Sequence, residues 1–167
     1  MSAVIDLFLD ICLFRKGPQD APASTLLLAI AIVAYVLVGL VLFGIEVGPT
    51  QALLQIVVEG GALLGFTYLT LLASGYRNRI LQTTIAMVGT DALISTSALP
   101  LVVVALYTQE GQIAYALLLA LTLWHLAVIA HILRHALSRS YSHGLVLAIA
   151  YFLGTYYLMN LVIGPPQ

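Results

Sequence analysis

The amino-acid sequence predicts an all-helical, polytopic integral membrane bundle of five transmembrane helices, preceded by a short interfacial amphipathic helix. Three observations support this fold class. Hydrophobic residues make up 62% of the 167-residue chain and charged residues 8%, and the mean hydropathy is +1.07. An average soluble domain is about 45–50% hydrophobic and about 25% charged. The chain therefore has too few ionised side chains to cover a water-soluble globule.

The first predicted element is a helix over residues 3–14, within a cytoplasmic region that covers residues 1–23. It is too short to cross a bilayer. Its surface is apolar except at Asp6 and Asp10, which lie one turn apart and share a face. Gly17 and Pro18 are expected to end it. Two interpretations stay open: the helix lies on the cytoplasmic leaflet, or it docks on a partner protein.

Five apolar segments then follow, each about as long as the roughly 20 residues that cross a hydrocarbon core of about 30 Å. A backbone in lipid has to satisfy its own hydrogen bonds, and the alternation of barrel strands is missing, so each segment is predicted to be a helix. The transmembrane bundle covers residues 24–163, and residues 164–167 form an external tail. The predicted spans are 24–45, 51–74, 80–107, 112–136 and 142–163.

Basic side chains predict the orientation, because Lys and Arg that flank spans stay on the cytoplasmic side. All six either precede the first span or flank the connections that follow the second and fourth spans, and the other two connections have none. With five crossings, the N-terminus is expected in the cytoplasm and the C-terminus outside, in a bacterial inner membrane. The six residues are Arg15, Lys16, Arg77, Arg79, Arg134 and Arg139.

Three ionisable residues, Glu59, Asp91 and His125, fall near the middle of predicted spans. Each costs roughly 2.5–3.5 kcal/mol on insertion scales and needs a partner or a wet cavity. At about 1.5 Å per residue, the three lie at similar depths. They could form a proton relay or an ion site. Alternatively, they could pair to hold the bundle in one register, or the carboxyls could simply be protonated by burial.

A second set of histidines lies near the cytoplasmic end. His131 and His135 are one turn apart on the fourth span, and His143 opens the fifth. Neutral imidazoles at one depth could bind a transition metal or a haem, although no haem-attachment motif accompanies them. We expect no bound cofactor, and the haem or metal alternative stays open.

Small residues four apart occur in two spans: Gly61 and Gly65 in the second, and Ala150 and Gly154 in the fifth. Such pairs let helix backbones approach closely. The pattern predicts helix packing, either inside the bundle or with another subunit.

Composition and motifs also narrow the function. A net charge of −1 with no basic stripe argues against nucleic-acid binding. No nucleophile elbow, zinc-protease, phosphate-loop or dinucleotide motif is found, so an enzyme is the least supported class.

We expect a non-enzymatic accessory or scaffold subunit that contacts the lipid bilayer and other membrane subunits. The alternatives are a small proton-coupled or ion transporter using Glu59, Asp91 and His125, and a haem- or metal-binding subunit. Whether a small molecule or ion is its substrate stays open.

The architecture resembles that of a known family. An N-terminal segment over residues 4–20, followed by five spans over residues 24–163, is similar to the Yip family of Rab-interacting membrane proteins and its bacterial relatives. The family's characteristic D-L-Y-G-P segment does not occur, and the nearest string is R-K-G-P-Q-D at residues 15–20. The resemblance implies a non-enzymatic membrane protein that acts through partners or bilayer shape, and it carries over no site residue.

Overall fold

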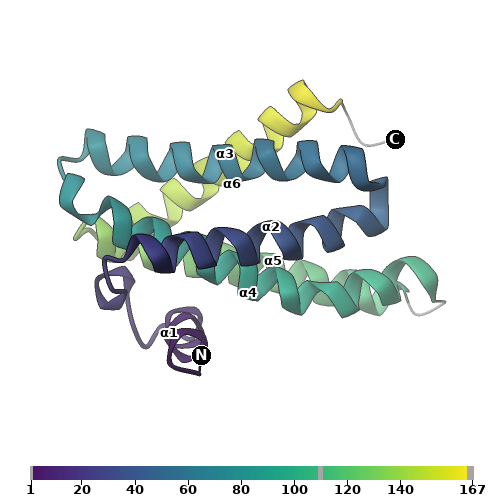
Figure 1. Ribbon diagram of the computed structural model, residues 1–167, viewed down its shortest axis with the longest axis horizontal. Coiled ribbons are helices and arrows are strands. Elements are labelled where there is room, and N and C mark those ends of the chain that lie inside the picture. Colours follow the sequence, from purple (N-terminus) through teal and green to yellow (C-terminus); the bar gives the residue numbers. More distant parts are fainter. Residues whose placement is uncertain (1, 109–110, 165–167) are drawn as a thin grey trace.

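The computed structural model describes residues 2–108 and 111–164 as a bundle of long helices with one short helix at its flank (Figure 1). All five predicted spans are confirmed as helices that are long and apolar enough to cross a membrane, and their ends differ from the predicted ends by at most two residues. Of the predicted tail, only Gly164 lies within the described residues. The elements are α1 (Ser2–Cys12), η1 (Pro18–Asp20), α2 (Thr25–Val47), α3 (Pro49–Ala73), η2 (Arg77–Arg79), α4 (Ile80–Tyr107), α5 (Gly111–Ala136) and α6 (Tyr141–Val162).

Side-chain caps and glycines set the helix ends. The Ser24 hydroxyl accepts the Leu27 N–H at 3.3 Å and begins α2, and the Ser140 hydroxyl begins α6 in the same way. Gly48 alone separates α2 from α3. Its φ of 84° lies in the left-handed region that favours glycine. The connections are therefore short enough to hold consecutive helices side by side.

Helix α4 is the central helix of the bundle. All ten residues from 83 to 92 are buried, because α2 and α5 pack closely along α4 while α1 and α3 cover other parts of it. Helix α6 packs mainly on α5. At that crossing, a Cβ on Gly144 would collide with the carbonyl oxygen of Ala130. The sequence analysis missed this close approach.

The predicted small-residue pairs do not make such a crossing. Gly61 and Gly65 of α3, together with Ala150 and Gly154 of α6, line a surface groove of about 360 Å³ between the two helices. A Cβ added at any of these three glycines would meet no heavy atom within 4 Å. Packing inside the bundle through these residues is therefore not observed, whereas contact with another subunit stays a prediction.

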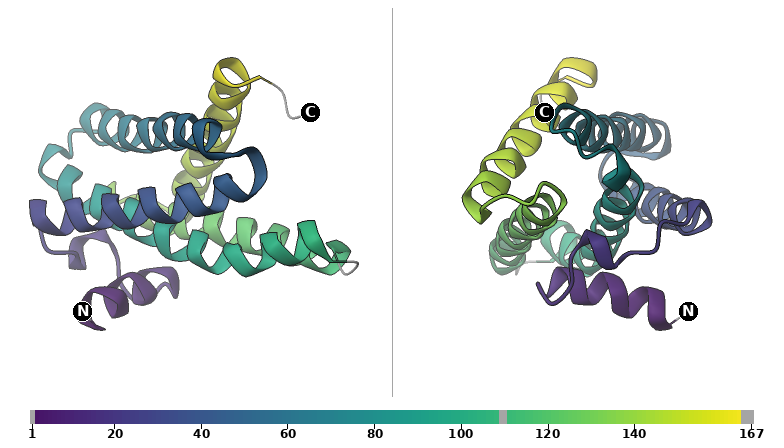
Figure 2. Two further views of the ribbon diagram at one scale, coloured as in Figure 1. Left: turned by 45° about the vertical axis from the view of Figure 1, so that its right-hand side comes forward. Right: turned by 90° about the vertical axis from the view of Figure 1, so that its left-hand side faces the viewer.

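Helix α1 packs crosswise against α4 and α5 of its own bundle. Figure 1 shows α1 nearly end-on, and the right-hand view of Figure 2 shows it lengthwise while the long helices recede from the viewer. Its buried face consists of Leu7, Phe8, Ile11 and Cys12. The Phe8 ring occupies the space that a Cβ on Gly89 of α4 would need. Phe8 and Gly89 thus fit together as a knob and a hole.

Polar contacts hold the segment that follows α1. Trp124 of α5 donates its indole N–H to the Cys12 carbonyl at 3.2 Å, and Nε2 of His131 lies 2.9 Å from the Lys16 carbonyl oxygen. The carboxylate of Asp10 pairs with Lys16 at 2.8 Å, which raises the pKa of the Lys16 ammonium. The helix ends at Cys12, before the predicted end, because Phe14 adopts a positive φ of 60°.

The fit of Phe8 against Gly89 can be tested through Cys12, the only cysteine of the chain. Burial raises the pKa of its thiol to about 12, so very little thiolate is available for alkylation at neutral pH. We expect Gly89→Leu to displace α1 and to increase the rate of Cys12 alkylation by iodoacetamide at least tenfold. Gly61→Leu is the matched control, because open space surrounds Gly61. Equal rates in both variants would show that α1 does not dock through Phe8.

Candidate functional site

The structure brings the three predicted ionisable residues to the middle of the bundle, on three different helices. Glu59 lies on α3, Asp91 on α4 and His125 on α5. Two hydroxyl-bearing residues complete this central polar cluster, Tyr35 of α2 and Ser95 of α4. Asp91 is 6% exposed, and Glu59 and His125 are half-buried.

The cluster consists of two groups. In the first, the Tyr35 hydroxyl donates to Oε2 of Glu59 at 3.4 Å. In the second, the Ser95 hydroxyl donates to Oδ1 of Asp91 at 3.1 Å, and Nε2 of His125 lies 4.0 Å from the same oxygen. Tyr35 of α2, Gly60 of α3 and Val88 of α4 line one pocket between those helices. The two groups therefore lie at a similar level of the bundle, on neighbouring helices.

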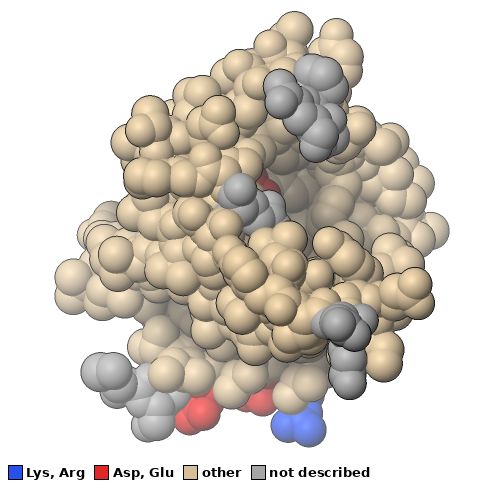
Figure 3. Space-filling view, turned by 90° about the vertical axis from the view of Figure 1, so that its right-hand side faces the viewer, with Lys and Arg blue, Asp and Glu red and all other residues tan. Residues whose placement is uncertain are grey.

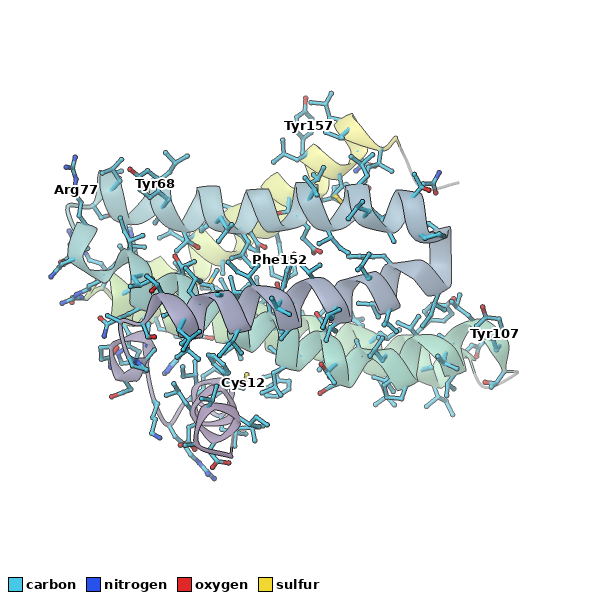
Figure 4. The ribbon with its side chains drawn as sticks, in the orientation of Figure 1. Cys12, Tyr68, Arg77, Tyr107, Phe152 and Tyr157 are labelled. Carbon is cyan, nitrogen blue, oxygen red and sulfur yellow. The ribbon has the colours of Figure 1, made fainter. Side chains whose placement is uncertain are left out.

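Aromatic side chains of α6 form one wall of this site. Phe152 packs edge-on against the His125 ring with 5.6 Å between ring centroids, and Figure 4 shows Phe152 in the middle of the bundle. The neighbouring Tyr151 is buried and packs against Phe66 of α3 at 5.3 Å. These rings fix the imidazole on the side of α5 that faces Asp91.

Neither carboxyl of the cluster forms a salt bridge with Lys or Arg within residues 2–108 and 111–164. A carboxylate in an apolar interior is very costly unless a proton, a cation or hydrogen bonds compensate it. One tyrosine hydroxyl, one serine hydroxyl and one imidazole do not neutralise two carboxylates. Buried carboxyls without a cationic partner take up protons and become neutral, or they bind a positive charge.

The two ends of the bundle differ in how they enclose this site. Figure 3 looks at the end opposite the arginines, where the surface is hollowed and a small part of an acidic residue is visible inside the hollow. Figure 1 shows α6 leaning away from α4 and α5 toward this end. At the other end, Leu71, Ala136 and Leu137 form a buried cluster. The bundle is thus more open at the hollowed end than at the arginine-bearing end.

The histidines predicted as a metal or haem site do not converge. The rings of His131 and His135 lie 4.6 Å apart, but His131 is committed to the Lys16 carbonyl and His143 is exposed on α6. In the described part of the chain, no group of three or more His, Cys, Asp or Glu side chains is placed to hold a metal ion. The metal hypothesis for these three histidines therefore receives no support from the geometry.

Sequence reasoning found the acids and the histidine but missed their hydroxyl partners. Tyr35 is the only polar residue between positions 26 and 45. A buried tyrosine usually finds a hydrogen-bond partner. A single tyrosine in that apolar run therefore indicates a polar partner on a neighbouring helix. Ser95 follows Asp91 by four residues, which puts both on one helix face.

Comparisons with known proteins assign no family to this chain. No protein-family model, curated protein or solved structure matches it. The function is therefore inferred from the geometry of the central polar cluster and from the two ends of the bundle.

The contact between His125 and Asp91 predicts a measurable stability effect. Replacing His125 by Leu removes the imidazole from the buried carboxyl, so we expect the free energy of unfolding to fall by about 1–3 kcal/mol. His143→Leu is the control, because the His143 side chain is exposed. The measurement is denaturant-induced unfolding of each purified variant in detergent. A loss as large for His143→Leu as for His125→Leu would contradict the assigned contact.

Proposed function

We propose that this chain is an integral membrane protein that binds a proton at the central polar cluster and exchanges it with the compartment at the hollowed end. The observation that carries the proposal is that two carboxyls and an imidazole lie on three neighbouring helices in the middle of the bundle, without a Lys or Arg partner among the described residues. This function corresponds to the proton-coupled or ion transporter considered from the sequence.

The chemistry of the side chains supports this choice. Carboxylate and hydroxyl oxygens suit protons and hard cations, which prefer oxygen ligands. Two carboxyls in an apolar surrounding gain most from a bound positive charge.

The proposal includes an orientation. Arg77, Arg79 and Arg134 lie at one end of the bundle, which we call the arginine end, and Figure 4 shows Arg77 there and Tyr107 at the other end of α4. Positively charged ends of transmembrane helices stay in the cytoplasm. We therefore assign the arginine end and the N-terminus to the cytoplasm of a bacterium, and the hollowed end and the C-terminus to the outside of its inner membrane.

Flux measurements test this proposal directly. The protein is reconstituted into liposomes that contain a pH-sensitive dye, and a potassium diffusion potential drives proton entry. We expect Asp91→Asn and Glu59→Gln to reduce the flux at least tenfold, because each removes a carboxyl that carries the proton. Parallel experiments apply sodium and potassium gradients.

The control variant is Asp10→Asn, which removes an acidic group from α1 that pairs with Lys16 outside the cluster. Its flux should equal that of the unchanged protein, and all three variants should elute from a sizing column at the same volume. Flux that is unchanged in both cluster variants, or an unchanged protein that conducts no protons, would overturn the proposal.

A second candidate function is that of an accessory subunit, as expected from the sequence. The groove of Gly61, Gly65, Ala150 and Gly154 favours it, because an open row of small residues accepts the helix of another membrane subunit. Exposed Tyr157 lies further along α6, and Figure 4 shows its side chain pointing away from the bundle.

This candidate predicts that mild detergent recovers the protein in a larger complex. Filling the groove with Gly65→Leu and Gly154→Leu together is expected to release it from that complex, because the added side chains block helix approach. Size-exclusion chromatography with light scattering measures the mass. The control is Gly44→Leu on α2, which has open space around it and lies outside the groove. A monomer in every case would rule out the accessory role.

A further inference from the structure

A second polar site lies at the arginine end, away from the central polar cluster. A pocket of about 260 Å³ opens there between η1, the start of α4 and the end of α5. The part of its lining that matters here consists of Gln19, Arg79, Gln82, Thr83, His135 and Ser138. All of these side chains carry hydrogen-bond donors, and no described carboxylate lines the pocket.

Thr83 is the first indication of a ligand. Its side chain is completely buried, and its hydroxyl has no hydrogen-bond partner in the described structure. Other threonines of α4 behave differently, since the hydroxyls of Thr84 and Thr90 donate to the carbonyls of Ile80 and Ala86, one turn earlier. A buried unpaired hydroxyl costs about 1–3 kcal/mol, so an acceptor in the pocket would recover this energy.

Arg79 is the second indication. Its Nη1 donates to the carbonyls of His135 and Ala136, at 3.2 and 2.9 Å, and to the Ser138 hydroxyl at 2.8 Å. These bonds use carbonyls of the last turn of α5, which have no N–H donor one full turn ahead within the helix, and they fix the guanidinium in the pocket wall. Within the described residues, no hydrogen bond engages the remaining guanidinium N–H groups. A guanidinium fixed in this way is preorganised for a phosphate or carboxylate.

We infer that this pocket binds a phosphate group, held by the Arg79 guanidinium and by the Thr83 hydroxyl, with donors from Gln19 and His135 at its rim. The pocket is smaller than the roughly 300–1,000 Å³ of sites for drug-sized ligands. It therefore suits a phosphate with a small substituent. An anionic phospholipid headgroup and a small soluble phosphate compound share this chemistry.

Binding is measured as the shift of the thermal unfolding midpoint in nonionic detergent, with sodium chloride of equal ionic strength as the blank. One arm titrates inorganic phosphate and the other titrates short-chain phosphatidylglycerol. We expect at least one of them to raise the midpoint of the unchanged protein. A shift with inorganic phosphate identifies a soluble phosphate compound as sufficient, whereas a shift with phosphatidylglycerol alone identifies a lipid headgroup.

Two variants locate the binding. Thr83→Val keeps the side-chain volume but removes the hydroxyl, and it should weaken binding at least fivefold without lowering the midpoint of the ligand-free protein. Thr84→Val is its control, because the Thr84 hydroxyl is bonded to the helix backbone. Gln19→Glu places a negative charge at the exposed rim and should weaken binding at least tenfold. Gln112→Glu is the control for this variant, because it makes the same change at the other end of the bundle.

Two results of these binding measurements would contradict the inference. If neither ligand shifts the midpoint of the unchanged protein, the pocket does not bind phosphate and the inference is wrong. The same conclusion follows if Gln19→Glu and Gln112→Glu bind equally well. Should Thr83→Val fail to fold, the pair of glutamate variants still decides the question, because both positions are exposed.

Discussion

The burial of Asp91 is the constraint on which the rest of the bundle depends. Asp91 belongs to the stretch of α4, residues 83–92, in which every residue is buried. A carboxyl in such a place loses its hydration and needs partners from the helices that cover it. Ser95 of the same helix and His125 of α5 are those partners. Because His125 must face α4, the rotation of α5 about its axis is fixed, and the aromatic wall of α6 then packs behind the imidazole.

The same buried helix explains why the N-terminal segment docks on its own bundle. Gly89 leaves a gap on the surface of α4, and the Phe8 ring fills it. The last carbonyls of a helix lack intrahelical partners, which is costly in an apolar surrounding. Trp124 donates to the Cys12 carbonyl and thereby satisfies one of these groups. Helix α1 is thus held by apolar packing and by a hydrogen bond to a carbonyl at its own C-terminal end.

Hydropathy and length were sufficient to predict the five long helices, because a backbone in lipid has few alternatives to a helix. Counting residues along each span placed Glu59, Asp91 and His125 at one level, and the structure places His125 4.0 Å from Asp91, with Glu59 on the neighbouring α3. Counting residues along a helix gives the depth of a side chain but not the direction in which it faces around the helix axis. The role of Tyr35 as the partner of Glu59 was therefore missed. For the same reason, Gly144 makes the close crossing, whereas Gly61 and Gly65 line an open groove.

The asymmetry of the two ends connects the central polar cluster with the pocket at the arginine end. The bundle is hollowed at one end (Figure 3), while Leu71, Ala136 and Leu137 are packed together at the other. On the proposed function, release of a proton toward the arginine end requires these contacts to separate. The proposed phosphate pocket lies between η1, α4 and the end of α5 and shares Ala136 with the packed contacts. A ligand that bridges them stabilises the closed arrangement in proportion to its preference for that state, so occupation of the pocket would oppose opening at this end.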